Sequence, residues 1–286
     1  MTGRRFRTIG AAAVISGLVL AGCGDTDDDT TATTASADGT GGGDCAVDQL
    51  ALVADGTLTI GTDSPAFPPW FVDDDPTNGE GFESAVAYAV ADELGFEAAD
   101  VTWTVQAFNN VIAPGEKDFD FDINQVSISD DRDEAVDFSS GYYDVNQAIV
   151  GFADSPAAEA ASLADLRSLK LGAQVGTTSL DFITDVIDPE AEPFVYNDNS
   201  AAKAALDAGQ VDAIVLDLPT AFYVSAVEIE GTAVIGQFPA AEGQEQFGLV
   251  FGEGNPLRDC VNEALARLEE SGQLREIEQE WLSDVV

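Results

Sequence analysis

Cationic side chains are scarce in this chain, which has 53 acidic residues and only 11 basic ones, so a cation near a predicted strand end is a candidate for binding an anion. Arg132 follows an apolar segment that reads as a strand and precedes a helical pattern, so we expect it in the first turn of a helix. There its guanidinium, free backbone N–H groups and the hydroxyls of Ser127 and Ser129 can converge on a carboxylate. An alternative stays open, in which Ser129 only caps the helix and Arg132 pairs with one of the neighbouring acids, Asp130, Asp133 or Glu134.

Two further polar residues stand where strands end and helices begin. Asp217 follows the predicted strand 213–216 and precedes Pro219, and a carboxylate in that position can hold an ammonium group. Thr178 comes directly after Gly176-Thr177 at another predicted helix start, where its hydroxyl and amide can meet a carboxylate. Helix capping explains both residues as well, so the caps and the ligand contacts remain alternatives.

Strands and helices must alternate along the chain to position these residues. Apolar runs predict strands at 58–62, 101–105, 119–126, 147–152, 170–173, 194–196, 213–216 and 247–251. Helical periodicity predicts helices at 82–94, from about 130, from 178, and at 201–208, 256–270 and 274–281. This order predicts one or two largely parallel sheets, which bind ligands at the carboxyl ends of their strands.

The N-terminal segment has the layout of a secretory signal. Three arginines precede an apolar run that ends in Leu20-Ala21-Gly22-Cys23, and the run is shorter than a membrane span of about 20 apolar residues. We expect a lipoprotein signal peptide at 1–22, acylation of Cys23 and a disordered tether at 23–44 rich in Asp, Thr, Ala and Gly. A plain signal peptide with an incidental cysteine is the alternative. The predicted location is the outer face of the cytoplasmic membrane.

The composition of the segment after Cys23 excludes several functions. It carries all 53 acidic residues and eight basic ones, a formal charge of −45 that disfavours nucleic acid and electrostatic binding to anionic lipid. Histidine is absent, which excludes imidazole catalysis and His-ligated metal, and we expect no metal or other cofactor. Cys45 and Cys260 remain as an even pair in an exported protein, which predicts a disulfide.

Several motifs resemble, in order, the family 3 amino-acid-binding group of type II periplasmic binding proteins. They are Gly61-Thr62-Asp63 with Phe67-Pro68-Pro69-Trp70, Gly81-Phe82-Glu83, Ser127 to Arg132, Val136-Asp137-Phe138-Ser139 with Tyr142-Tyr143, Gly176-Thr177-Thr178, and Val211-Asp212-Ala213 leading to Asp217. The resemblance covers nearly all of 45–286. It implies an α/β fold of two lobes joined by two hinge strands, with a ligand cleft between them. Lobe one is expected at 45–146 plus 245–286, and lobe two at 147–244.

The resemblance also implies roles for individual residues. Ser127, Ser129, Arg132 and Thr178 are expected on the α-carboxylate of an amino acid, and Asp217 on its α-ammonium group. Phe67 and Phe108 resemble the aromatic walls around the ligand side chain, Asp63 is expected to contact that side chain, and Trp70 is expected to be structural. Gln125 and Gln174 are further candidates for polar contacts. The chain departs from the family pattern at Ser84-Ala85, at Asn124-Gln125 and in a longer first loop.

The function that follows is amino-acid capture for an ABC transporter permease by a monomer anchored to the membrane through its lipid. Asp63 is left without a counter-charge when a zwitterion neutralises Arg132 and Asp217, so a polar, neutral or basic ligand is expected. Two alternatives stay open. One is a dehydratase-like enzyme on the same fold, and the other is a sensory subunit that presents its ligand to a receptor.

Overall fold

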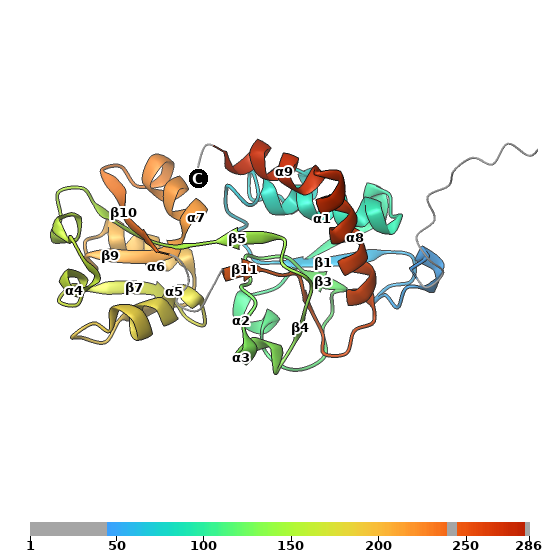
Figure 1. The fold of residues 1–286 in the computed structure, drawn as a ribbon, viewed down its shortest axis with the longest axis horizontal. Coiled ribbons are helices and arrows are strands. Elements are labelled where there is room, and N and C mark those ends of the chain that lie inside the picture. Colours follow the sequence, from blue (N-terminus) through green and yellow to red (C-terminus); the bar gives the residue numbers. More distant parts are fainter. Residues whose placement is uncertain (1–44, 239–244, 284–286) are drawn as a thin grey trace, which may run out of the picture. The chain divides into compact units, whose positions relative to one another are not determined.

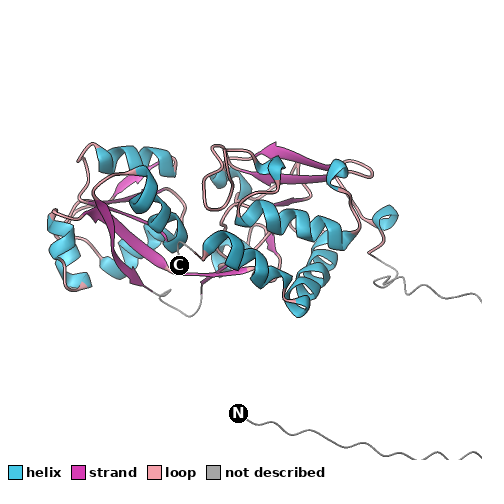
Figure 2. Ribbon diagram, turned by 90° about the horizontal axis from the view of Figure 1, so that it is seen from above, coloured by secondary structure: helices cyan, strands magenta, loops and turns pink. Residues whose placement is uncertain are grey.

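The computed structural model describes residues 45–238 and 245–283 as an α/β structure with two five-stranded sheets and one two-stranded ribbon (Figures 1 and 2). The predicted signal peptide, the acylation site Cys23 and the tether lie outside these residues. The strands are β1 Leu58–Thr62, β2 Val101–Val105, β3 Phe121–Asp122, β4 Asp137–Phe138, β5 Tyr143–Val145, β6 Gln147–Phe152, β7 Leu171–Gln174, β8 Phe194–Tyr196, β9 Ala213–Asp217, β10 Thr232–Phe238, β11 Glu245–Phe247 and β12 Val250–Phe251.

Helices cover both sheets. They are α1 Phe82–Leu94, α2 Phe108–Val111, α3 Asp130–Asp133, α4 Leu163–Leu166, α5 Thr178–Asp181, α6 Asn199–Asp207, α7 Leu218–Tyr223, α8 Leu257–Ser271 and α9 Gln273–Leu282. Helices α5 and α7 each continue into a wider π-type turn, at Phe182–Ile187 and Val224–Glu228. No helix in the described part of the chain is long and apolar enough to cross a membrane.

The first sheet has the order β2-β1-β3-β12-β4 and the second the order β10-β6-β9-β7-β8. The strands of each sheet fall within one of the two predicted lobes, whose boundaries remain a prediction. The expectation of largely parallel sheets was wrong, because half of the strand pairs are antiparallel. Every antiparallel pair within the sheets involves β6, β10 or β12. These strands flank the two places where the chain crosses between the sheets, and they run into their sheets from the opposite end.

The ribbon of β5 and β11 lies at these crossings (Figure 1). Residue Val145 ends β5 and Gln147 begins β6, so one nearly continuous strand leads from the ribbon into the second sheet. The returning chain enters the first sheet through β11 and then β12. One of the two hinge strands expected from the resemblance therefore corresponds to β5–β6, and the return crossing passes through 239–244, which lie outside the described residues.

The loop after β1 is fixed by the start of α1. Gly81 has φ +96°, and a Cβ at this position would lie 2.5 Å from the carbonyl oxygen of Trp70, so only glycine fits. The backbone N–H groups of Phe82 and Glu83 donate to the carbonyls of Pro69 and Trp70. Trp70 is fully buried and packs edge-on against Phe82, which confirms its structural role. The loop that carries Asp63 and Phe67 is therefore anchored at its far end.

Hydrophobic clusters lie on both faces of each sheet. One joins β1, β3 and β12 to α1, α8 and α9, and a smaller one under α2 covers the opposite face. Two further clusters cover the second sheet, one with α6 and α7 and the other with α4 and the turn 182–187. The Cys45–Cys260 disulfide ties the start of the described chain to α8, with the two Cα atoms 5.5 Å apart, as the even cysteine pair predicted.

Candidate functional site

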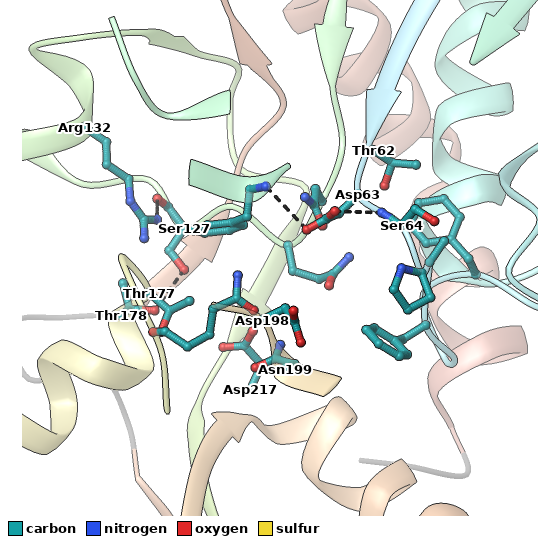
Figure 3. A pocket seen from close by; sticks show the side chains of 18 residues that line it. Thr62, Asp63, Ser64, Ser127, Arg132, Thr177, Thr178, Asp198, Asn199 and Asp217 are labelled. Carbon is teal, nitrogen blue, oxygen red and sulfur yellow. Dashed lines mark hydrogen bonds between the residues drawn. The ribbon is translucent and has the colours of Figure 1, made fainter. Parts of the chain in front are cut away.

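One pocket brings together strand ends and loops from both sheets, and its empty volume, partly open to solvent, is about 640 Å³. In Figure 3 the side chains of Arg132, Asp63 and Asp217 surround this common space. The lining residues are Thr62, Asp63, Ser64, Pro65, Ala66, Phe67, Phe71, Phe108, Asn124, Gln125, Ser127, Arg132, Gln174, Thr177, Thr178, Asp198, Asn199 and Asp217. Nine of the ten candidate ligand residues are among them, and Ser129 is the exception. Ligand contact by these residues remains a prediction.

Arg132 is held in the pocket by neutral groups. Its guanidinium donates to the carbonyl oxygen of Ser127 at 2.5 Å and to that of Gly176, in the second sheet's half, at 2.9 Å. The guanidinium carbon also lies 5.6 Å from the centre of the Phe108 ring. Within the described residues no carboxylate comes within 4.0 Å of this guanidinium, so the alternative in which Arg132 pairs with Asp130, Asp133 or Glu134 does not occur. A buried cation held by carbonyls and an aromatic ring has no partner that neutralises its charge, so it can pair with an anion.

Ser129 and Thr177 cap the two short helices at this end of the pocket. The Ser129 hydroxyl accepts from the backbone N–H of Arg132, and the Thr177 hydroxyl accepts from that of Leu180. Ser129 therefore orients the first turn of α3 rather than lining the pocket. Because Thr177 takes the cap, the Thr178 hydroxyl is directed to the pocket, where it lies 3.4 Å from the Ser127 hydroxyl and accepts from Gln147 Nε2 at 3.3 Å.

Asp217 ends β9 and does not cap α7 with its side chain. Its carboxylate instead accepts a hydrogen bond of 2.9 Å from Gln147 Nε2. Burial raises the pKa of Asp217 to about 8, with Glu245 acting in the same direction, while the Gln147 contact and the charge of Arg132 oppose the shift. A cationic group placed against Asp217 restores its ionised form.

The other end of the pocket carries Asp63 and the aromatic walls. The Asp63 carboxylate accepts from the backbone N–H of Ser64 at 2.7 Å and of Phe108 at 3.4 Å. Burial is the main cause that raises the pKa of Asp63, and the charge of Asp198 adds to it. Phe67 is covered by Lys203, whose Nζ lies 3.8 Å from the ring centre. Two carboxylates, Asp63 after β1 and Asp198 after β8, thus lie at one end of the pocket.

The two glutamine candidates differ in their surroundings. Gln125 adopts a left-handed backbone with φ 49°, and its backbone N–H and side-chain amide both donate to the carboxylate of Glu83. That amide is thus engaged beneath the pocket wall. Gln174 ends β7, lines the pocket and is 6% exposed, with no hydrogen bond from its side chain to other described residues. Gln174 is therefore the glutamine with a free polar group.

The raised pKa values of Glu83 and Asp217 predict how the stability of the folded protein depends on pH. Burial raises the pKa of Glu83 to about 7, against the donors Tyr142 and Gln125, and that of Asp217 to about 8. Between about pH 4 and pH 8 both acids keep a proton in the folded state, whereas in the unfolded state they have lost it. The free energy of unfolding therefore falls as the pH rises through this range, by at most about 1.4 kcal/mol per group per pH unit.

The measurement is the melting temperature of ligand-free protein between pH 5 and 8 in 1 M salt, which screens the surface charges. We expect a steady fall with pH and a shallower fall in Asp217→Asn. A flat profile in the unmodified protein contradicts the raised pKa values.

Sequence reasoning missed several residues of the site. Gln147 begins β6 and Glu245 begins β11, and neither belongs to the recognised motifs, so only the fold brings them near Ser127 and Asp217. Asp198 and Asn199 follow β8, at a strand end that signalled a pocket position in the same way as Asp217. Among the described residues no cluster of three acidic or cysteine side chains is arranged to hold a metal ion.

The fold and this pocket define a two-lobe periplasmic-type binding protein. The profile of the bacterial extracellular solute-binding proteins, family 3, matches residues 58–284, and the chain belongs to that family.

Relatives support the same assignment. The L-cystine-binding protein TcyJ of Escherichia coli is 28% identical over 230 residues, 79% of this chain and 82% of the relative. The L-arginine-binding protein of Pseudomonas aeruginosa is 27% identical over 244 residues, 81% and 90% of the two chains. An ancestral arginine-binding protein solved with arginine has 32% identity and a TM-score of 0.67, over 79% of this chain and 98% of that one.

Proposed function

We propose that this chain is the extracytoplasmic receptor of an ABC-type importer and that it binds an amino acid with a polar neutral or basic side chain. The observation that carries the proposal is the buried Arg132 guanidinium, which faces the same pocket as Asp217 and has no carboxylate partner among the described residues. An α-amino acid offers a carboxylate and an ammonium group a few ångströms apart. Such a zwitterion neutralises both residues at once.

The carboxylate half of the proposed site consists of Arg132, Thr178 and Ser127. The guanidinium is oriented by two carbonyls and keeps further N–H donors, so a ligand carboxylate receives charge-assisted hydrogen bonds. The Thr178 hydroxyl at the start of α5 lies on the same side as Ser127. The guanidinium on α3 and the hydroxyl on α5 thus come from the two predicted lobes, and a bound carboxylate would bridge them.

The side-chain half determines the class of ligand. The carboxylates of Asp63, Asp198 and Asp217 line the pocket, and Arg132 is the one cationic side chain among its lining residues. After a zwitterion neutralises Arg132 and Asp217, two carboxylates remain. A ligand side chain with N–H donors, as in arginine, lysine or glutamine, satisfies them, whereas that of glutamate or aspartate adds repulsion. The arginine-binding relatives support this direction.

The location and partners follow from the N-terminus and from the family. We propose that Cys23 carries the lipid anchor, that the tether 23–44 holds a monomeric body near the membrane, and that a permease receives the ligand. The −45 charge of the segment after Cys23 supports the absence of nucleic acid among its partners.

We also propose that the chain is not an enzyme. One structural neighbour, an ancestral amino-acid-binding protein of 28% identity and TM-score 0.64, covering 79% of this chain and 95% of that one, is described as a precursor of cyclohexadienyl dehydratase. The binding roles of the family and its relatives favour a protein that binds its ligand without converting it.

Calorimetry against all common L-amino acids tests the function. We expect one-to-one binding with Kd near 1 μM, about −8 kcal/mol, for the best ligand, and weaker binding of glutamate and aspartate. Mass spectrometry of the released ligand should show it unchanged. If no amino acid of the panel binds, the amino-acid assignment is contradicted. Tighter binding of glutamate than of arginine and glutamine contradicts the charge argument, and a chemically converted ligand contradicts the proposal that the chain is not an enzyme.

A further inference from the structure

Glu245, the first residue of β11, lies between the two halves of the pocket, although it does not line it. The Ser127 hydroxyl donates to Glu245 Oε1 at 2.5 Å. Gln147 Nε2 donates to both carboxylate oxygens of Glu245, at 3.3 and 3.1 Å, to Asp217 Oδ1 at 2.9 Å and to Thr178 Oγ1 at 3.3 Å. One amide group therefore links the acid predicted to hold the ligand's ammonium group to a second acid, which in turn contacts the carboxylate half.

The orientation of the Gln147 amide is fixed. Its side chain is 1% exposed, and its Oε1 accepts a hydrogen bond of 2.6 Å from the Ser179 hydroxyl. Rotating the amide would turn its oxygen toward two carboxylates and remove the acceptor of Ser179. Asp217 and Glu245 consequently face the same N–H₂ group, and a neutral amide that donates to both carboxylates does not cancel the repulsion between their negative charges.

We propose that Glu245 is a positioning residue of the ligand site, which acts through Gln147 to keep a proton on Asp217 until the ligand's ammonium group displaces it. This inference rests on the proposed function. Binding then converts a carboxylic acid and a free ammonium group into an ion pair, and the proton leaves to the solvent. No bond other than that O–H bond is broken.

The charged groups around Asp217 support this proton balance. Glu245 on β11 and Glu83 on α1 favour the protonated acid, as does burial, which is the largest cause of its raised pKa. Arg132 on α3 and the Gln147 amide on β6 favour the ionised form but do not outweigh burial. An ammonium group in contact with Asp217 supplies the missing positive charge without exposing the site to water.

The test combines calorimetry with one conservative variant. Binding of the best amino acid from the panel is measured between pH 6 and 9 in phosphate and Tris, whose ionisation enthalpies differ, so the protons released per ligand can be counted. At pH 7 we expect about one proton per ligand for the unmodified protein. Glu245→Gln keeps an oxygen acceptor for Ser127 and Gln147 but removes the charge. We expect it to lower the pH midpoint of proton release by about one unit.

Asp144→Asn is the matched control. Asp144 lies on the partner strand β5, is exposed and contacts Gln246 on the outer side of the ribbon, so this variant removes one hinge charge without touching Gln147. We expect its midpoint to equal that of the unmodified protein. Equal shifts in both variants, or no shift in Glu245→Gln, overturn the inference.

A ligand-free measurement separates this inference from the proposed function. Carboxyl ¹³C resonances of aspartate-labelled protein are titrated, and Asp217→Asn identifies the Asp217 signal by its loss. Glu245→Gln should lower the titration midpoint of that signal, whichever ligand the protein binds. A signal that does not move overturns the role of Glu245. If no amino acid of the panel binds, the proposed function is contradicted. The link between Glu245 and Asp217 is then still tested by the titration of the Asp217 carboxyl signal.

Discussion

Replacing Arg132 by alanine is expected to abolish measurable amino-acid binding while the protein remains folded. The variant removes the cation that would meet the ligand carboxylate, and a lost partner of a desolvated charge pair costs about 2–5 kcal/mol. This corresponds to a rise in Kd of roughly 30-fold to several thousand-fold. Calorimetry with the best ligand measures it, and circular dichroism establishes that the fold is retained, because the carbonyls freed at Ser127 and Gly176 face a pocket that water can enter.

Arg258→Ala is the control for this experiment. Arg258 pairs with Asp137 at 3.5 Å on a partly exposed surface near the start of α8, and it does not line the pocket. The Arg258→Ala variant loses one positive charge, as Arg132→Ala does, so a general effect of lost positive charge on this acidic protein would appear in both variants. Binding by Arg132→Ala within threefold of the unmodified protein would show that Arg132 has only a structural role.

Removing the Cys45–Cys260 disulfide is expected to cause a large loss of stability with little change in binding. The bond closes a loop of 215 residues, for which the chain-entropy model gives an upper benefit of about 5 kcal/mol. Cys260 is 6% exposed in the core beside α1, so Cys45→Ala with Cys260→Ala avoids placing a polar group there. Guanidinium unfolding compares the double variant with the oxidised protein.

Reduction provides the internal control for the disulfide. A reducing agent should shift the unfolding midpoint of the unmodified protein toward that of the double variant and should leave the variant unchanged. Equal midpoints for oxidised protein, reduced protein and the variant would show that the closed loop contributes no stability. Ligand affinity measured below the unfolding transition should stay within a few-fold of the original, since neither cysteine lines the pocket.

Local sequence patterns predicted those elements whose burial follows one period. Helix α1 has the predicted bounds, because its apolar residues recur at helical spacing and Gly95 ends it in a left-handed conformation with φ 93°. Strands β1, β2 and β6 also have their predicted bounds. The strand expected at 119–126 shrinks to Phe121–Asp122, since the chain turns at Gln125 to bind Glu83. Strand β10 was missed because it is mostly half-buried and shows no regular alternation.

The candidate site divides in the same way. Arg132, Asp217 and Thr178 were predicted because strand ends followed by helix starts form a recognisable local pattern, and the resemblance added Asp63, Phe67 and Phe108. Glu245 lies 118 residues from Ser127 and 98 from Gln147, so its hydrogen bonds depend on the return of the chain through β11. No local pattern carries that information. Nine of the pocket-lining residues were therefore predictable, whereas Gln147 and Glu245, which form hydrogen bonds to Asp217 and Ser127, were not.

A crystal structure of the protein grown with the amino acid that binds best tests the proposed ligand site most directly. The expected result is a ligand in the pocket of Figure 3 with its carboxylate about 2.7–3.1 Å from the Arg132 guanidinium and its ammonium nitrogen at a similar distance from the Asp217 carboxylate. An amino acid bound in the opposite orientation, or outside the pocket with neither residue in contact, would contradict the assignment.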